Sequence, residues 1–293
     1  MKLKAAEAQR LKDKVAIVTG GAGSNSIGRS ISVRFAEEGA RVAVTDIDAE
    51  GAVEVAREIT DGGGTAIALA CDVRDQAQCH AMAKQVAERW GGRIDILVNN
   101  AGAYRGVMTG WKPFTEWTSD EWDHMHNVNV KGQWHCAQAV FPYMKPLGYG
   151  KIINLGSTSF FEGIPGFIHY ISSKAGVIGF TRGLGKELGE FGIHVNTLSP
   201  GFTLTQAALD QARSDPSFVD VRRKAQALNM RSLTADDMAG PAVFLASEDS
   251  DMITCQTIIV SSLKLIENQA VLLICQIRII TKNLIDSSLS FLQ

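Results

Sequence analysis

The chain has 293 residues, of which 45% are hydrophobic and 20% are charged, and its formal net charge is -2. A chain of this length can bury a substantial core, and so small a net charge gives no electrostatic footprint for nucleic acid or an anionic membrane. The five cysteines are odd in number and widely spaced, and the first residues lack the apolar centre of a secretory signal. These features predict a cytoplasmic protein with reduced thiols. The apolar patch Ala270 to Ile280 is too short to cross a membrane, and the histidines show no metal-ligand spacing.

Short apolar runs alternate with helical patterns through the first third of the chain. Strands are expected at Val15–Thr19, Arg41–Asp46, Thr65–Cys71 and Ile94–Val98, and helices at Arg29–Glu38, Asp48–Thr60 and Asp75–Trp90. Unbroken alternation of this kind indicates an α/β protein of the Rossmann type, with a doubly wound parallel sheet and helices on both faces. We therefore expect a three-layer α/β/α sandwich.

A glycine-rich loop, Gly20 to Gly28, follows the first expected strand and leads into the helix pattern that begins at Arg29. Glycines let a backbone approach a pyrophosphate closely, and a helix N-terminus directs free N–H groups at it. The arrangement therefore suits a dinucleotide. A plain tight turn is the alternative, and the position after the first strand favours the dinucleotide.

The second expected strand ends in Asp46, at the distance beyond the glycine loop that suits a carboxylate on the adenosine ribose. Such a carboxylate accepts both ribose hydroxyls of NAD and repels the 2′-phosphate of NADP, so Asp46 predicts NAD. The alternatives are a cap for the next helix or a solvated acid. Asp72 follows the third expected strand at the edge where ligands bind, and a role as a helix N-cap is equally natural there.

Tyr170 and Lys174 are four residues apart, so on a helix they share one face. A fixed ammonium favours the phenolate and makes a tyrosine a usable acid and base near neutral pH. Ser157 follows an apolar run and offers a hydroxyl to the same substrate oxygen. The spacing alone is weak, because an ordinary amphipathic helix produces it by chance.

Further motifs, in order, make the chain similar to the classical short-chain dehydrogenase/reductase family from about Lys12 to Val260. The motifs are Asn99-Asn-Ala-Gly102, Asn127-Val-Asn-Val-Lys-Gly132, Lys151-Ile-Ile-Asn-Leu-Gly-Ser157, Tyr170-x-x-x-Lys174, and Pro200-Gly201 with Thr205. The resemblance implies a seven-stranded parallel sheet, one NAD(P)-binding domain over residues 1–260, and a homotetramer or homodimer. Residues 261–293 depart from the family's usual ending and form an atypical tail.

The resemblance also implies a catalytic tetrad of Asn129, Ser157, Tyr170 and Lys174. Tyr170 would donate the proton in reduction and accept it in oxidation, while Lys174 would lower its pKa and hold the nicotinamide ribose. Ser157 would hydrogen-bond the substrate oxygen, and Asn129 would hold a water that links Lys174 to solvent. The implied cofactor contacts are Gly20, Ser26, Ile27, Gly28, Asp46, Asp72, Val73, Asn99, Ala101, Gly102, Tyr170, Lys174, Pro200, Gly201, Thr203 and Thr205. Among these, Asn99 would brace the central strand.

The glycine loop departs from the family pattern. Thr19 to Gly28 is longer than the family's Thr-Gly-x-x-x-Gly-x-Gly, and Ser26 stands where the middle glycine would fall. The roles of Gly21, Gly23, Ser24 and Asn25 are therefore open. A similar loop occurs in the enoyl reductase branch, which separates its tyrosine and lysine by six residues. The closer spacing of Tyr170 and Lys174 argues against enoyl reduction.

Aromatic residues cluster on both sides of the expected site. Trp111, Phe114 and Trp117 either line a substrate entrance or cover the edge of the sheet. Phe160, Phe161 and Phe167 precede Tyr170 and favour a substrate with an aromatic or bulky apolar part. Phe202 to Met230 is expected to form a helical lid.

These features predict an NAD-dependent oxidoreductase that interconverts a small-molecule secondary alcohol and a ketone or aldehyde. Two rival functions stay open, an NADPH-dependent reductase of 3-oxoacyl thioesters and a cofactor-binding protein without turnover. A serine hydrolase is disfavoured, because Gly156-Ser157-Thr158-Ser159 lacks the Gly-x-Ser-x-Gly elbow.

Overall fold

A computed structural model describes residues 9–103, 112–206, 208–210, 228 and 231–261, and its centre is a parallel sheet of seven strands. In spatial order the strands are β3 (Thr65–Ala70), β2 (Arg41–Asp46), β1 (Val15–Thr19), β4 (Ile96–Asn99), β5 (Gly150–Leu155), β6 (Ile193–Pro200) and β9 (Thr257–Val260). The strand order reverses between β1 and β4, which is where ligands bind in open α/β sheets. The predicted seven-stranded parallel sheet is confirmed.

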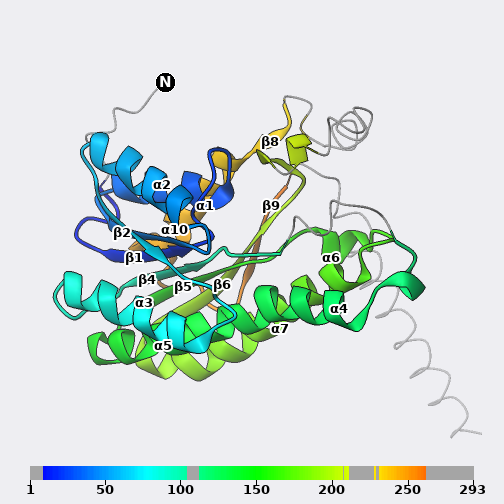
Figure 1. The fold of residues 1–293 in the computed structure, drawn as a ribbon. Helices are drawn as coiled ribbons and strands as arrows, with labels where there is room; N and C mark the ends of the chain where they lie inside the picture. The colour runs from blue at the N-terminus through cyan, green and yellow to red at the C-terminus, as the bar shows by residue number, and fades with distance from the viewer. Residues whose placement is uncertain (1–8, 104–111, 207, 211–227, 229–230, 262–293) are drawn as a thin grey trace, which may run out of the picture.

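Helices cover both faces of the sheet, as Figure 1 shows. On one face α1 (Ile27–Glu37), α2 (Ala49–Asp61) and α10 (Ala239–Ala246) pack over a core that includes Val18, Val44 and Ile153. On the other face α3 (Gln76–Arg89), α5 (Gly132–Met144) and α7 (Ile168–Leu188) pack over a core that includes Ile17, Leu97 and Ile152. Successive side chains of a strand point to opposite faces, so each central strand feeds both cores. The expected three-layer arrangement is confirmed.

The helix boundaries are set by capping side chains. Helix α1 begins at Ile27, earlier than the expected Arg29, because Ser26 caps it and accepts a hydrogen bond from Arg29 N at 3.1 Å. Asp48 and Asp75, expected as first helical residues, are instead the N-caps of α2 and α3. A capping side chain must bond the backbone of its own first turn, so the regular helix starts one residue later.

A π-helical turn, Asn127–Lys131, joins α4 (Ser119–His126) to α5. The amide of Gly132 bonds the carbonyl of Asn127, which is the i to i+5 pattern of this turn. Single π-helical turns of this kind often occur at functional sites. Asn129, a member of the expected tetrad, lies inside it and is fully buried.

Two short strands beside the main sheet, β7 (Thr203–Leu204) and β8 (Leu233–Thr234), pair in parallel. The remaining elements are the short helix α6 (Ser159–Glu162) and single helical turns at Phe114–Glu116, Lys145–Leu147, Gly189–Phe191, Ala235–Met238 and Glu248–Ser250. Within the described ranges no helix is long and apolar enough to cross a membrane. Most of the expected lid, Trp111, and all of the tail beyond Ser261 lie outside the described residues.

Candidate active site

The carboxyl ends of β1, β4 and β5 bring three of the sequence motifs together. Asn100, just after β4, donates through Nδ2 to the carbonyls of Thr19 at 2.9 Å and Gly20 at 2.7 Å. The hydroxyl of Thr19 in turn accepts from the amides of Asn100 and Ala101, each at 3.1 Å. The start of the glycine loop is therefore fixed to the turn that follows β4.

The glycine loop is a close-packed cradle that fits a dinucleotide backbone. Gly20 has a φ of +65°, and a Cβ on it would lie 2.7 Å from Ala101 Cα. A Cβ on Gly28 would overlap the carbonyl of Gly20. Both positions thus require glycine. The amides of Ile27 and Gly28 belong to the first helical turn of α1, where no preceding carbonyl of the helix can accept from them, so they suit an anion.

Asp46 ends β2 directly beside this loop. Its Oδ2 accepts from the amide of Ala22 and its Oδ1 from the amide of Asp48, both at 3.0 Å. Arg29, a base in the first turn of α1, is ion-paired with Glu58. A fixed carboxylate without a described partner base favours ribose hydroxyls over a phosphate dianion.

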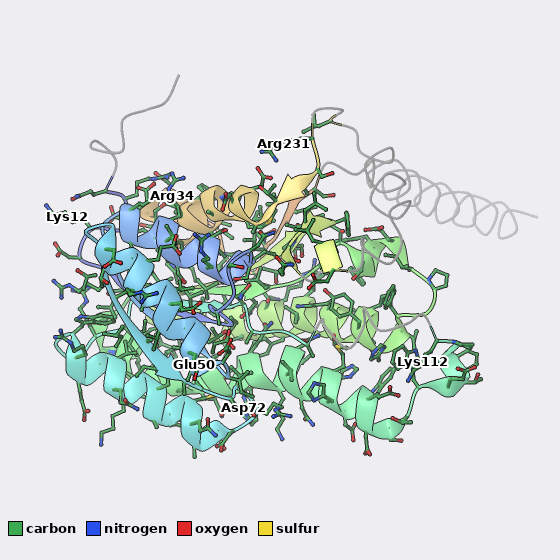
Figure 2. The ribbon with its side chains drawn as sticks, turned by 45° about the horizontal axis from the view of Figure 1, so that its top comes forward. Lys12, Arg34, Glu50, Asp72, Lys112 and Arg231 are labelled. Carbon is green, nitrogen blue, oxygen red and sulfur yellow. The ribbon has the colours of Figure 1, made fainter. Side chains whose placement is uncertain are left out.

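The carboxylate of Asp72 is ion-paired with Arg74, a residue to which the sequence analysis gave no role. The carboxylate accepts from the guanidinium of Arg74, with the shortest contact at 2.6 Å, and this bonding lowers the pKa of Asp72. Val73 turns inward, and a Cβ on Gly132 would lie 2.7 Å from its side chain. Figure 2 labels Asp72 after β3 and Glu50 at the start of α2, and places Lys112 far from both, near α4.

Tyr170 and Lys174 lie together in the first turns of α7. Lys174 is 5% exposed, and its Nζ lies 5.8 Å from the centroid of the Tyr170 ring. The Nζ donates to the carbonyl of Leu155, the last residue of β5, at 2.8 Å. Among the described residues no carboxylate lies within ion-pair distance of it, and burial lowers the pKa of Lys174 to about 8.

Asn129 adjoins the same lysine through Gly102. Its Oδ1 accepts from the amide of Ala103 at 2.7 Å, and its Nδ2 donates to Ser173 Oγ at 3.0 Å. A Cβ on Gly102 would lie 3.4 Å from Asn129 Oδ1 and 3.8 Å from Lys174 Nζ. The turn after β4, the π-helical turn and α7 therefore meet at Gly102.

Ser157 follows β5 in the loop that leads to α6. Its Oγ accepts from the amide of Ser159 at 3.2 Å, and the amide of Thr158 donates to the carbonyl of Pro200 at 3.0 Å. The serine loop is thereby joined to the segment that contains Gly201, Thr203 and Thr205. Thr203 is buried and donates to the carbonyl of Gly201 at 2.9 Å.

Asn99 differs from the other expected cofactor contacts, because it lies inside the sheet. It is 1% exposed, and its Nδ2 donates to Asn154 Oδ1 at 2.9 Å. Asn154 in turn donates to Thr181 Oγ1, which accepts also from Thr197. This chain of hydrogen bonds joins β4, β5, β6 and α7, and the position of Asn99 suits a bracing role better than direct contact.

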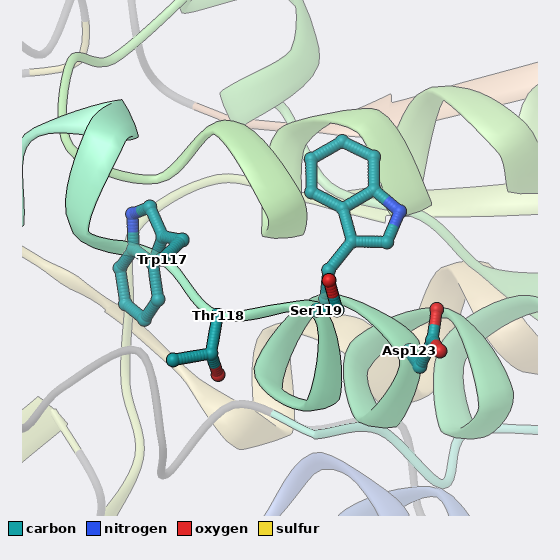
Figure 3. Close-up of a pocket in the computed structure, with 5 residues that line it drawn as sticks. Trp117, Thr118, Ser119 and Asp123 are labelled. Atoms are coloured by element: carbon teal, nitrogen blue, oxygen red, sulfur yellow. The ribbon is translucent and has the colours of Figure 1, made fainter.

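The aromatic segment before α4 packs against α7. The rings of Trp117 and His169 lie 3.8 Å apart between centroids, and burial lowers the pKa of His169. Phe114, by contrast, is 78% exposed. An open surface hollow of about 270 Å³ at the start of α4 is lined by Trp117, Thr118, Ser119, Trp122 and Asp123 (Figure 3). None of the four expected tetrad residues lines this hollow.

Comparison with known proteins identifies the family. The family model described as Enoyl-(Acyl carrier protein) reductase matches residues 20–262, which is most of the chain. The chain belongs to the short-chain dehydrogenase/reductase family. It is an oxidoreductase of this family that acts on CH–OH groups with an NAD(P) cofactor.

Three relatives illustrate the range of the family members that this chain is similar to. The BbsD subunit of a hydroxy(phenyl)methylsuccinyl-CoA dehydrogenase from Thauera aromatica is 36% identical over 250 residues, covering 85% of this chain and 96% of its own. A 3-oxoacyl-(acyl-carrier-protein) reductase from Staphylococcus aureus is 38% identical over 250 residues, covering 84% and 95%. A gluconate 5-dehydrogenase from Burkholderia cenocepacia, solved with NADP and tartrate, has a TM-score of 0.78 at 33% identity, covering 87% and 96%.

Sequence reasoning missed three features near the site. Arg74 gave a signal, since a base two residues from an acid can fold back on it, but the pair was not recognised. The π-helical turn has no periodicity of its own to detect over so few residues. The contacts of Asn25 with Leu204 and Gln206 join residues far apart in sequence, so no local pattern could reveal them.

Proposed function

We propose that this protein is an NAD-dependent dehydrogenase that interconverts a secondary alcohol and a carbonyl compound, with Tyr170 as the proton donor and acceptor. The observation that carries the proposal is Lys174, a buried lysine beside the Tyr170 ring with no described carboxylate to neutralise it. With a pKa of about 8, Lys174 is mainly an ammonium at neutral pH. A charge so placed stabilises the phenolate that remains after Tyr170 gives up its proton.

The other residues have positioning and charge-stabilising roles in this proposal. In the reduction direction the Ser157 hydroxyl donates to the substrate oxygen and Tyr170 transfers a proton to it. When bound, NAD(H) accepts or supplies the hydride. Lys174 holds the nicotinamide ribose, and Asn129 holds a water through which Lys174 exchanges protons with solvent.

Asp46 supports NAD as the cofactor. Its carboxylate is fixed by two backbone amides at the end of β2, and two further acids, Asp48 and Glu50, follow it at the start of α2. The 2′-phosphate of NADP carries nearly two negative charges at pH 7, so this site would repel it. The neighbour solved with NADP and the 3-oxoacyl reductase favour the rival cofactor, which makes the test necessary.

The substrate is proposed to carry an aromatic or bulky apolar part. Phe167 packs with Tyr170 and Met125 in one small apolar cluster, and Phe160 and Phe161 lie in contact with each other just after the serine loop. The Thauera relative is named for a substrate with a phenyl group. These residues would favour apolar substituents near the reacting carbon.

The test is turnover of aromatic, sugar and acyl alcohols with NAD and with NADP, measured from the absorbance of the reduced cofactor. We expect turnover with NAD to exceed turnover with NADP by at least about tenfold, because the carboxylate repels the phosphate. Asp46→Asn should narrow this ratio, since it removes the charge and keeps the shape. Asp61→Asn, which removes a carboxylate at the exposed C-terminal end of α2, is the matched control.

A clear preference of the parent protein for NADP, with a 3-hydroxyacyl thioester as the best alcohol of the panel, would support the rival 3-oxoacyl thioester reductase. Binding of NAD without turnover of any substrate in the panel would support the cofactor-binding protein without activity.

A further inference from the structure

Asn25 lies in the longer part of the glycine loop, where the family pattern leaves its role open. Its side-chain Nδ2 donates to the carbonyl of Leu204 at 3.1 Å. Its own carbonyl accepts from the amide of Gln206 at 2.9 Å. Two hydrogen bonds therefore join the glycine loop to a segment that follows β6.

This segment is also held at its other end, beside the serine loop. The carbonyl of Pro200 accepts from the amide of Thr158 at 3.0 Å, and the amide of Gly201 donates to the carbonyl of Val260 at 2.9 Å. Residues 200–206 thus extend from the neighbour of Ser157 to the glycine loop. They connect the neighbourhood of Ser157 with the glycine loop, the two places that a dinucleotide would have to reach.

A second tie joins α1 to the strand that pairs with this segment. Strand β7 pairs with β8, and Ser30 on α1 donates to Asp236 Oδ1, just after β8, at 2.7 Å. Asp236 belongs to the turn that Thr234 caps. The Ser30–Asp236 hydrogen bond therefore holds α1 against the segment that follows β8. Asn25 is the residue through which the glycine loop itself contacts β7.

We propose that Asn25 is a positioning residue that fixes the separation between the glycine loop and the strand beside the nicotinamide. This inference rests on the proposed NAD-dependent function. A ligand that binds at two places gains affinity when the distance between them is already correct, because less ordering remains to be done on binding. The Asn25 side chain supplies that order through one hydrogen bond to Leu204.

The test uses two ligands that differ in whether they reach both places. NADH would extend to the nicotinamide strand, whereas ADP-ribose lacks the nicotinamide ring and would end at the ribose that Lys174 is proposed to hold. We expect Asn25→Ala to raise the dissociation constant of NADH roughly three- to tenfold, the value of one hydrogen bond, and to leave that of ADP-ribose unchanged. Both constants are measured by titration calorimetry without substrate.

Alanine is a suitable replacement, because Asn25 is not among the described residues with a positive φ. Ser24→Ala, at the exposed neighbour, controls for a change in the loop. Hydrogen exchange adds a readout that needs no cofactor. The Gln206 amide, which donates to the Asn25 carbonyl, should exchange several-fold faster in Asn25→Ala than in the parent or in Ser24→Ala.

Equal weakening of NADH and ADP-ribose would overturn the inference, because Asn25 would then only shape the glycine loop. Unchanged NADH binding would overturn it as well, whatever the exchange rate. Failure of the parent protein to bind either ligand would instead contradict the proposed function and, with it, this inference.

Discussion

Two buried lysines lie near opposite ends of the central strand β5, and each lies near a tyrosine ring. Lys151 near the start of β5 is fully buried, with its Nζ 5.9 Å from the Tyr149 ring, and Lys174 is 5% exposed, with its Nζ 5.8 Å from the Tyr170 ring. Burial and aromatic neighbours are therefore nearly the same at the two lysines. Their polar partners differ.

Lys151 forms an ion pair with Asp251 at 2.7 Å and a hydrogen bond to Ser250 at 3.3 Å. Lys174 has a backbone carbonyl and no carboxylate among the described residues. A carboxylate neutralises a buried ammonium and makes it a structural tie, whereas an unneutralised ammonium remains free to act on a neighbouring phenol. The difference in partner, more than burial, separates the candidate catalytic lysine from the structural one.

The largest expected effect is on activity at the tyrosines. Tyr170→Phe should lower turnover about 10³-fold, because it removes the group that transfers the proton. Tyr149→Phe, which alters the tyrosine beside Lys151, is the matched control. The hydroxyl of Tyr149 is buried without a hydrogen-bond partner among the described residues, so its loss should leave turnover unchanged and stability equal or slightly higher. Steady-state kinetics and thermal unfolding of both variants measure this, and an active Tyr170→Phe protein would refute the mechanism.

The second effect is a pH dependence of stability that originates from Lys174. Its pKa is about 8 in the folded protein and 10.5 as the reference for the unfolded chain. Between these values the unfolded chain binds more protons, so stability rises with pH, and the burial penalty is fully present below pH 8. The free energy of unfolding of the parent relative to Lys174→Met should rise by up to about 1.4 kcal/mol per pH unit over this window.

Urea unfolding of the two proteins from pH 7 to 10.5 measures the Lys174 effect. Lys186→Met, at an exposed position of the same helix, controls for removing a positive charge from α7. A stability difference between parent and Lys174→Met that falls with rising pH would contradict the assigned direction.

The third effect concerns the structural lysine. Asp251→Ala should lower the free energy of unfolding by about 2 kcal/mol, because Lys151 would remain buried with its charge unpaired. The loss is less than for a fully buried pair, since the Asp251 side chain is 51% exposed. Asp249→Ala, two residues earlier and exposed, is the control. Turnover per folded molecule should not change. A fall in turnover without a fall in stability would contradict the assignment of Lys151 as a structural lysine.

The smallest expected effect is a change in stability on replacing Cys255, which shortly precedes β9. Cys255 has a φ of +61°, a left-handed conformation that glycine adopts without cost. Cys255→Gly should raise the free energy of unfolding by about 1 kcal/mol, whereas Cys255→Ala should not, because alanine keeps the Cβ that causes the strain. Thermal unfolding of the two variants separates strain from loss of the thiol. Equal stabilities of the two would show that strain is not the cause.

The sequence predicted those parts of the molecule that depend on local pattern. Strands β1 and β2 have the expected bounds, because their apolar runs end sharply at glycine or charged residues. Strand β4 begins at Ile96, later than the expected Ile94, since the buried Asp95 side chain accepts from the amide of Val15 at 2.8 Å. Strand β3 ends at Ala70, before the expected Cys71.

In the candidate site, too, the features that depend on local sequence could be predicted, and those that depend on contacts between distant segments could not. Tyr170, Lys174 and Asn129 could be selected from short motifs, and the fold brings α7 and the π-helical turn, which carry them, together at Gly102. The environment that distinguishes Lys174 from Lys151 could not, because Asp251 is remote from Lys151 in the sequence. Contacts between distant segments leave no periodic signal, and motif spacing records residue types without their partners.

The π-helical turn at Asn127–Lys131 has a consequence for the rotation of α5. A turn of this type holds one more residue than an α-helical turn, and each residue rotates a helix by about 100°. Deleting one residue there would therefore leave the helix continuous while turning α5 by that angle. Cys136 and Val140, which now pack in the core with α3, would then face another direction. The rotation set by this turn lets one continuous helix direct Asn129 toward the candidate site and the apolar residues of α5 toward the core.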